Sequence, residues 1–264
     1  MPSTLVNHST TWATIYSLEN PTASFLVAIA LTCLITGLSK GGFGGTIGAL
    51  STPILTLFVP ASAASGIVLP ILLLGDVFSV TTYWRKWDLS ILKRMLPPAA
   101  LGIVLGTLYL NFAPANLAKT MLGLFCFAFA VYKIAESRLS PAAAYHPQNW
   151  HAPVSGFAAG TLSAIANAGG PPFSIYMLLR RLLPADFVAT AALFFAAINV
   201  MKMPGYIALG IFRPAVLLEF FWLLPLIPIG VWIGRKIVGR INRQLFETIV
   251  LISLVLTGLL LIAG

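Results

Sequence analysis

Long apolar segments, separated by short polar or glycine-rich breaks, are the feature that most constrains the fold of this chain. They extend from near residue 24 to residue 263 of the 264 residues. The composition agrees, because 58% of the residues are hydrophobic and only 9% are charged, whereas soluble domains carry about a quarter charged residues. No stretch of comparable size is left for a soluble domain. The sequence therefore predicts an all-α polytopic membrane protein.

The apolar segments fall into two groups of five when the chain is divided at glycine, proline and charged residues. The first group lies at residues 24–38, 45–59, 62–83, 92–111 and 116–134. The second group lies at residues 152–166, 170–180, 185–209, 215–234 and 245–263. We therefore predict a polar N-terminal tail at 1–23, transmembrane repeats at 24–135 and 152–264, and a cytoplasmic linker at 136–151.

The first two segments of each half are short, which predicts a broken-helix pair. About 15 helical residues rise only ~22 Å, whereas the hydrocarbon core of a bilayer is ~30 Å thick. Each pair is either a re-entrant hairpin or two tilted spans, and three transmembrane helices follow it. Both arrangements give an odd number of crossings per half. The second half would then enter from the opposite face, so we predict two inverted repeats.

The two halves also align at the residue level. Residues 100–124 match residues 228–252 at a constant offset of 128, which pairs the Gly-x-x-x-Gly motif of Gly102 and Gly106 with that of Gly230 and Gly234. Earlier in each half, Gly44-Gly45 and Gly169-Gly170 pair at an offset of 125. We expect the Gly-x-x-x-Gly motifs to let helix backbones pack closely, because small residues at that spacing do so in membranes.

The basic residues predict topology and not nucleic-acid binding. The formal net charge is +9, but the 16 Lys and Arg residues are spread between apolar segments and form no basic face. Placing the loop at 84–94 in the cytoplasm puts twelve of the 16 on that side, as the positive-inside rule requires. We therefore predict both termini outside. The predicted cytoplasmic loops are 84–91, 135–151, 181–185 and 235–244.

Cysteine and histidine indicate no metal or redox chemistry. Cys33 and Cys126 lie inside apolar segments, where a cysteine is usually a small buried hydrophobe. All three histidines lie in polar stretches, so none is placed to relay protons through the membrane interior. We predict no disulfide, no metal site and no cofactor.

Two glycine-rich breaks mark the predicted site: "SKGGFGGT" at 39–46 and "ANAGGPP" at 166–172. Unwound backbone at membrane depth survives only where protein buries it or where it lines a wet cavity. Matching breaks in the two halves of a transporter point to its binding site. Each break precedes a helix, whose free N–H groups and dipole favour an anion. We therefore predict a small anionic substrate, bound at mid-membrane between the repeats.

Charged and amide side chains in the apolar segments complete this prediction. Lys40 lies in the first break and Asn167 in the second, and Lys202 lies about 17 residues into an apolar segment, one turn after Asn199. A lysine near the bilayer centre costs at least ~2.5 kcal/mol, so we expect it to face a partner or a cavity. The candidate substrate-binding residues are Lys40, Gly41, Gly42, Gly44, Gly45, Thr46, Asn167, Gly169, Gly170, Asn199 and Lys202.

Asp76 is an acid deep within an apolar segment of the first half. Its carboxylate could neutralise Lys40 or Lys202, or it could take up and release a proton during transport. Two structural alternatives also apply to Lys202, which could extend to the membrane interface or pair with Asp76. The sequence leaves these roles open.

These residues resemble the sulfite exporter TauE/SafE family of bacterial membrane permeases, over about residues 24 to 263. The resemblance is carried by "GGFGGTIGALSTP", by its counterpart "GTLSAIANAGGPP" and by the basic loop after the third segment. It implies a permease in the bacterial inner membrane that exports sulfite, an organosulfonate or another small organic anion; in that membrane the termini, predicted outside from the charge distribution, would be periplasmic. The second break departs from the pattern, since it reads Asn-Ala-Gly-Gly-Pro-Pro.

The predicted function is thus a secondary transporter, with alternating access about the midplane site and with proton coupling as an option. A passive anion channel on the same repeats is the main alternative. A remote one is an intramembrane serine hydrolase, because residues 37–41 match G-x-S-x-G around Ser39. That enzyme would need a base, but no histidine lies in an apolar segment, and Lys40, adjacent to Ser39, would project in a different direction on a regular helix. The sequence leaves open whether the protein forms a homodimer.

The predicted orientation can be tested by cysteine labelling. Single cysteines placed in the loop at 84–91 and in the N-terminal tail should react on opposite sides of the inner membrane, because an odd number of crossings separates them. A membrane-impermeant maleimide applied to intact cells should label only the tail. Labelling of the 84–91 loop under the same conditions would reverse the topology.

Overall fold

The computed structural model describes residues 23–59, 61–112, 148–212 and 218–263. The predicted N-terminal tail up to residue 22, the segment at 116–134 and the linker up to residue 147 lie outside the described residues. The elements of the first half are α2 (Ala23–Gly42), η1 (Ile47–Leu50), α3 (Ser51–Thr56), α4 (Ala61–Thr82) and α5 (Leu89–Phe112). Those of the second half are α7 (His151–Ala166), α8 (Gly170–Leu179), α9 (Pro184–Ala208), η3 (Phe221–Leu223), α11 (Leu226–Val238) and α12 (Arg243–Ala263).

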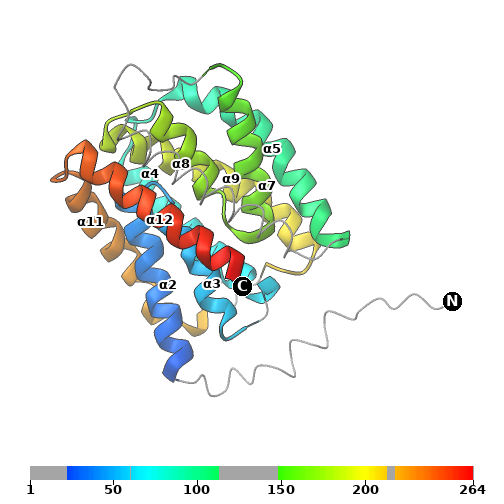
Figure 1. The fold of residues 1–264 in the computed structure, drawn as a ribbon. Coiled ribbons are helices and arrows are strands. Elements are labelled where there is room, and N and C mark those ends of the chain that lie inside the picture. Colours follow the sequence, from blue (N-terminus) through cyan, green and yellow to red (C-terminus); the bar gives the residue numbers. More distant parts are fainter. Residues whose placement is uncertain (1–22, 60, 113–147, 213–217, 264) are drawn as a thin grey trace.

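Every described element is a helix, which confirms the all-α prediction (Figure 1). Five of the described helices are long and apolar enough to cross a membrane, by length and composition. The helices pack side by side around a core of buried aliphatic and aromatic side chains. The chain is therefore a polytopic membrane protein.

Two predicted segments have different bounds in the structure. The segment at 24–38 is wrong at its end, because α2 continues to Gly42 and carries Lys40 in its last turn. Hydroxyl groups of α4 and of the residue after it stabilise this end, since Ser79 Oγ donates to the carbonyl of Lys40 and Tyr83 Oη to that of Gly41. The segment at 215–234 is not one helix, because the short η3 precedes α11, which begins only after Pro225.

The first two helical stretches of each half fold back as hairpins. After α3, Phe58 returns to the start of α2, where its ring centroid lies 6.1 Å from that of Phe25. In the second half, Ser155 Oγ near the start of α7 donates to the carbonyl of Pro172 in α8. At 16 and 10 residues, α7 and α8 rise only about 24 and 15 Å, too little to cross a bilayer. The 20 residues of α2 rise about 30 Å, so this helix is longer than predicted.

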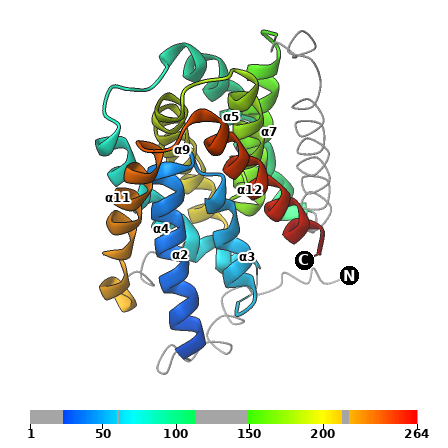
Figure 2. The same cartoon turned by 60° about the vertical axis from the view of Figure 1, so that its left-hand side comes forward.

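The two halves exchange helix contacts reciprocally. The fourth helix of the second half, α11, packs along α2, and the fourth helix of the first half, α5, packs along α7 (Figures 1 and 2). Glycines make both contacts close: a Cβ atom added at Gly230 would lie 2.6 Å from the carbonyl oxygen of Leu34, and one added at Gly106 would lie 2.6 Å from that of Thr161. The predicted packing role of the Gly-x-x-x-Gly motifs is therefore confirmed.

The halves also repeat individual hydrogen bonds. Tyr206 Oη donates to the carbonyl of Ala164 at 2.9 Å, across 42 residues, and the Tyr83–Gly41 bond spans the same 42 residues. Each partner in the second half lies 123 positions after its counterpart in the first. This register pairs Gly44 with Asn167, and both have left-handed backbones, with φ of 55° and 54°. This offset of 123 differs from the offset of 125 predicted for Gly44-Gly45 and Gly169-Gly170. The inversion of the repeats stays a prediction.

Three of the predicted cytoplasmic loops meet at one end of the molecule. Asp88 accepts hydrogen bonds from Ser90 that hold the pKa of its carboxyl below the usual value, and the Arg180 guanidinium has a weaker effect in the same direction. Arg94 Nη1 donates to Asn149 Oδ1 at 3.2 Å. Residues 88 and 149 belong to two of these loops and residue 180 directly precedes a third, so the three loops share a face. Its assignment to the cytoplasm stays a prediction.

Close glycine packing should be intolerant of a single methyl group. A Cβ atom at Gly234 would lie 2.5 Å from the carbonyl oxygen of Leu38, whereas one at Gly239 would lie 3.4 Å from the nearest atom, the Arg235 carbonyl oxygen. We expect Gly234→Ala to lower the free energy of unfolding by about 1–3 kcal/mol, because it over-packs the α2–α11 contact.

Thermal unfolding of the purified protein in detergent would measure this loss. Gly239→Ala is the matched control, since it adds the same methyl group without a close contact. Equal melting temperatures for the two variants would refute the packing role of Gly234.

Candidate functional site

The two predicted breaks lie directly against each other. A Cβ atom added at Gly170, where α8 begins, would lie 2.7 Å from the carbonyl oxygen of Gly45 in the first break. One residue further on, Thr46 Oγ1 lies 3.0 Å from Ser174 Oγ of α8. Glycine is required at position 170 for this approach, because a side chain there would meet the backbone of Gly45. The breaks therefore form one site that both halves build.

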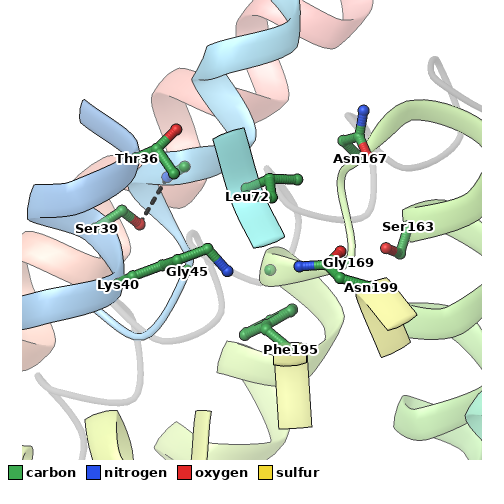
Figure 3. Close-up of a pocket in the computed structure, with 12 residues that line it drawn as sticks. Thr36, Ser39, Lys40, Gly45, Leu72, Ser163, Asn167, Gly169, Phe195 and Asn199 are labelled. Carbon is green, nitrogen blue, oxygen red and sulfur yellow. Dashed lines mark hydrogen bonds between the residues drawn. The ribbon is translucent and has the colours of Figure 1, made fainter. Parts of the chain in front are cut away.

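Asp76 occupies the centre of a charged cluster beside this junction. Its carboxylate pairs with Lys40 Nζ through Oδ1 and accepts a hydrogen bond of 2.6 Å from Asn199 Nδ2 through Oδ2. Lys40 comes from α2, Asp76 from α4 and Asn199 from α9. Figure 3 shows the Lys40 side chain extending from α2 toward Asn199, beside the ring of Phe195. The structure thus assigns Asp76 as the direct partner of Lys40.

Lys202 has a separate set of partners in the second half. Its ammonium donates to Asn167 Oδ1, to Ser163 Oγ at 3.2 Å and to the Ser163 carbonyl at 3.4 Å. The residue is fully buried, at 0% exposure. The alternatives of an interfacial Lys202 and of a Lys202–Asp76 pair are therefore wrong, because α9 places the ammonium against the end of α7.

Asn167 joins this second cluster to the first half. It ends α7 in the left-handed conformation, which Asn tolerates better than most residues. Its Oδ1 accepts from Lys202, while its Nδ2 donates to Thr52 Oγ1 at 3.3 Å and to the Ser65 carbonyl at 3.4 Å. Both ends of the amide are therefore used, and they connect α9 to α3 and α4.

A small cavity of about 20 Å³ lies between the two clusters. This space holds about one water molecule. Its lining residues come from both halves, and they are Thr36, Ser39, Lys40, Gly45, Gly48, Leu72, Ser163, Asn167, Gly169, Gly170, Phe195 and Asn199 (Figure 3). An anion of several heavy atoms therefore requires these walls to move apart.

Six of the predicted binding residues line the cavity, and five do not. The six are Lys40, Gly45, Asn167, Gly169, Gly170 and Asn199. Of the others, Gly41 and Gly42 face α11, where a Cβ atom at Gly42 would lie 2.6 Å from the Gly234 carbonyl oxygen. Gly44 packs against Phe187, and Thr46 bonds to Ser174 and to the Phe43 carbonyl. Lys202 reaches the cavity only through Ser163 and Asn167.

Sequence reasoning missed several lining residues. Thr36 precedes Lys40 by one helical turn, so its place on the same face could have been found from helical periodicity. Ser163 is the counterpart of Lys40 at the offset of 123. Leu72 and Phe195 look like ordinary core residues in the sequence, and only the packing of α4 and α9 brings them to the cavity.

Only one of the two helix N-termini predicted to attract an anion is present. The first break leads into η1, a short 3-10 turn, where the Gly48 N–H already donates to Ser39 Oγ at 2.7 Å. The second break leads into α8, a ten-residue helix whose N-cap residue Gly169 and first residue Gly170 line the cavity. The prediction is therefore wrong for the first break. The Ser39 hydroxyl is held by that backbone contact.

The arrangement is suited to holding an anion between cationic and amide groups. Within the described ranges, the buried charged side chains are Lys40, Lys202 and Asp76. Lys40 pairs with Asp76, whereas Lys202 has the neutral groups of Asn167 and Ser163 as partners, so with both lysines protonated these three side chains carry one net positive charge. In the same ranges, no three His, Cys, Asp or Glu side chains lie close enough together to hold a metal ion.

Comparison with known proteins identifies the family of the chain. A family model described as sulfite exporter TauE/SafE matches residues 29–261. No curated protein and no solved structure matches the chain. The match includes both breaks, the three buried charges and all described residues of the cavity. The chain belongs to the sulfite exporter TauE/SafE family.

Proposed function

We propose that this protein is a secondary transporter that exports a small sulfur-containing anion, such as sulfite or an organosulfonate. The family is a membrane transporter family whose description names sulfite. The anion would bind between the two breaks, with Lys40 and Lys202 supplying charge and with Asn167 and Asn199 supplying amide donors. The backbone N–H groups of Gly169 and Gly170 would add further hydrogen bonds, whereas Pro171 and Pro172 have none to offer.

The excess of buried positive charge is the observation that carries this proposal. Lys40 and Lys202 are 5% and 0% exposed, and Asp76 offsets only one of them among the described residues. An unpaired buried charge is costly in a medium of low dielectric constant, so the cluster favours a bound anion. Since the excess is one charge, it matches the charge of a sulfonate or a hydrogensulfite ion.

Alternating access would come from movement of one half against the other. The reciprocal packing of α2 with α11 and of α5 with α7 ties the hairpin of each half to a helix of the other half. Rocking of these two units would open the cavity to one side and then to the other. The small volume of the cavity supports this mechanism, because a rigid site of about 20 Å³ would admit no sulfonate.

Replacing either buried lysine by methionine should remove anion binding. Methionine has a similar length but no charge, so Lys202→Met and Lys40→Met should each weaken anion binding at least about 30-fold, as the loss of a buried charge contact does. Binding of sulfite and of methanesulfonate can be measured by isothermal titration calorimetry, and export by flux from proteoliposomes.

Lys93→Met is the matched control, because Lys93 is exposed at the start of α5 and lies outside the cavity. It should keep wild-type affinity and flux. Unchanged affinity and flux in both buried-lysine variants would refute the proposed site, whereas loss in all three variants would indicate a general defect of folding.

The main alternative, a passive anion channel, predicts a different dependence on concentration. A carrier has a limited number of sites that reorient, so its flux should saturate as the anion concentration rises. A proton gradient should also accelerate it if transport is proton-coupled. Flux that rises in proportion to the anion concentration and does not change with the proton gradient would favour the channel.

A further inference from the structure

The carboxylate of Asp76 lies in the position that an oxyanion would be expected to occupy. One oxygen pairs with Lys40 Nζ, and the other accepts from Asn199 Nδ2 at 2.6 Å. Two oxygens of one anionic group are thus held by a cation from α2 and by an amide from α9. Sulfite and sulfonates present oxygens of the same kind, negatively charged and about as far apart as those of a carboxylate.

The same donors are therefore already in use in this structure. Lys40 and Asn199 both line the cavity, and Asp76 is 3% exposed behind them. The cavity has room for about one water, although its walls carry the donors that an anion needs. The carboxylate, and not an empty space, is what currently satisfies these donors.

We propose that Asp76 is a tethered competitor of the transported anion. Substrate binds when its oxygens replace those of Asp76 on Lys40 Nζ and Asn199 Nδ2, and it leaves when the carboxylate returns. This inference rests on the proposed transport function, because it concerns the same site. In this proposal Asp76 controls how tightly the anion binds, which a carboxylate paired permanently with Lys40 would not do.

The correspondence between the two halves relates Asp76 to one of its own hydrogen-bond donors, Asn199. Asp76 and Asn199 are 123 positions apart, the same offset that relates Tyr83 to Tyr206. The two residues are therefore counterparts, one from each half, and they bond to each other. The position holds a carboxylate in the first half and an amide in the second, so the pair contains one acceptor anion and one donor.

Competition makes binding depend on pH in a defined direction. The charged groups that act on Asp76 from the elements packed on α4 are Lys40 of α2 and Lys202 of α9. α3 carries no titratable side chain, while α11 carries Arg235 and Lys236 in its last turn. A proton taken from water by the carboxylate releases Lys40. Anion binding should therefore tighten as the pH falls.

Asp76→Asn tests the proposal directly. Asparagine has the same shape without the charge, so it should compete poorly for Lys40. Affinity for methanesulfonate, measured at neutral pH by calorimetry on the purified protein, should rise at least about tenfold, because no carboxylate has to leave Lys40 before the anion can bind. The affinity of the variant should also depend less on pH than that of wild type between 5 and 8, because the variant keeps Lys202 but has lost the carboxylate; methanesulfonate itself stays a monoanion in this range.

Asn199→Asp is the complementary variant, because it places a second carboxylate on the counterpart position. It should weaken methanesulfonate binding relative to wild type. Asp88→Asn is the surface control, since Asp88 caps α5 outside the cavity. That variant should leave both the affinity and its pH dependence unchanged.

The outcomes separate this inference from the proposed function. If neither wild type nor any variant binds sulfite or methanesulfonate, the proposed function fails. If wild type binds but Asp76→Asn binds no more tightly and keeps the same pH dependence, the competition is refuted. Should Asp76→Asn not fold, two measurements still test the competition: the pH dependence of anion binding to wild type and the affinity of Asn199→Asp. If wild-type binding does not depend on pH and Asn199→Asp binds no more weakly than wild type, the proposal is refuted.

Discussion

The structure depends on burying charged groups in a medium that solvates them poorly. Lys40, Asp76 and Lys202 are each at most 5% exposed, and each is fully engaged by partners from other helices. Leaving any one of them unpaired would cost several kcal/mol. α2, α4, α7 and α9 must therefore converge at one point, and this requirement fixes the hairpins relative to the long helices.

Close backbone packing makes that convergence possible. Glycines on α2 and α11 let the two helices touch along their length, and the same is true of α5 and α7. Each contact joins a hairpin of one half to a long helix of the other half. A site at the meeting point then responds to any relative movement of the halves, which is the property that a transporter of this family needs.

The sequence predicted much of the candidate site and misjudged how its parts are connected. Lys40, Asn167 and Asn199 line the cavity as expected, because polar groups in apolar segments must gather where they can bond. Gly41 and Gly42 were assigned to the substrate, yet they serve the α2–α11 contact. A glycine in the sequence is the same whether a ligand or a helix approaches it, so the two roles could not be separated.

The sequence by itself determined the all-helical membrane architecture and the presence of two lysines and one acid in the apolar interior, and it predicts two repeats. These follow from local composition and from the spacing of breaks. Only the tertiary structure decided which groups pair, with Asp76 on Lys40 and Asn199, and Lys202 on Asn167 and Ser163. Those pairings join residues up to 123 positions apart. They depend on helix rotation and register, which packing sets and local sequence does not.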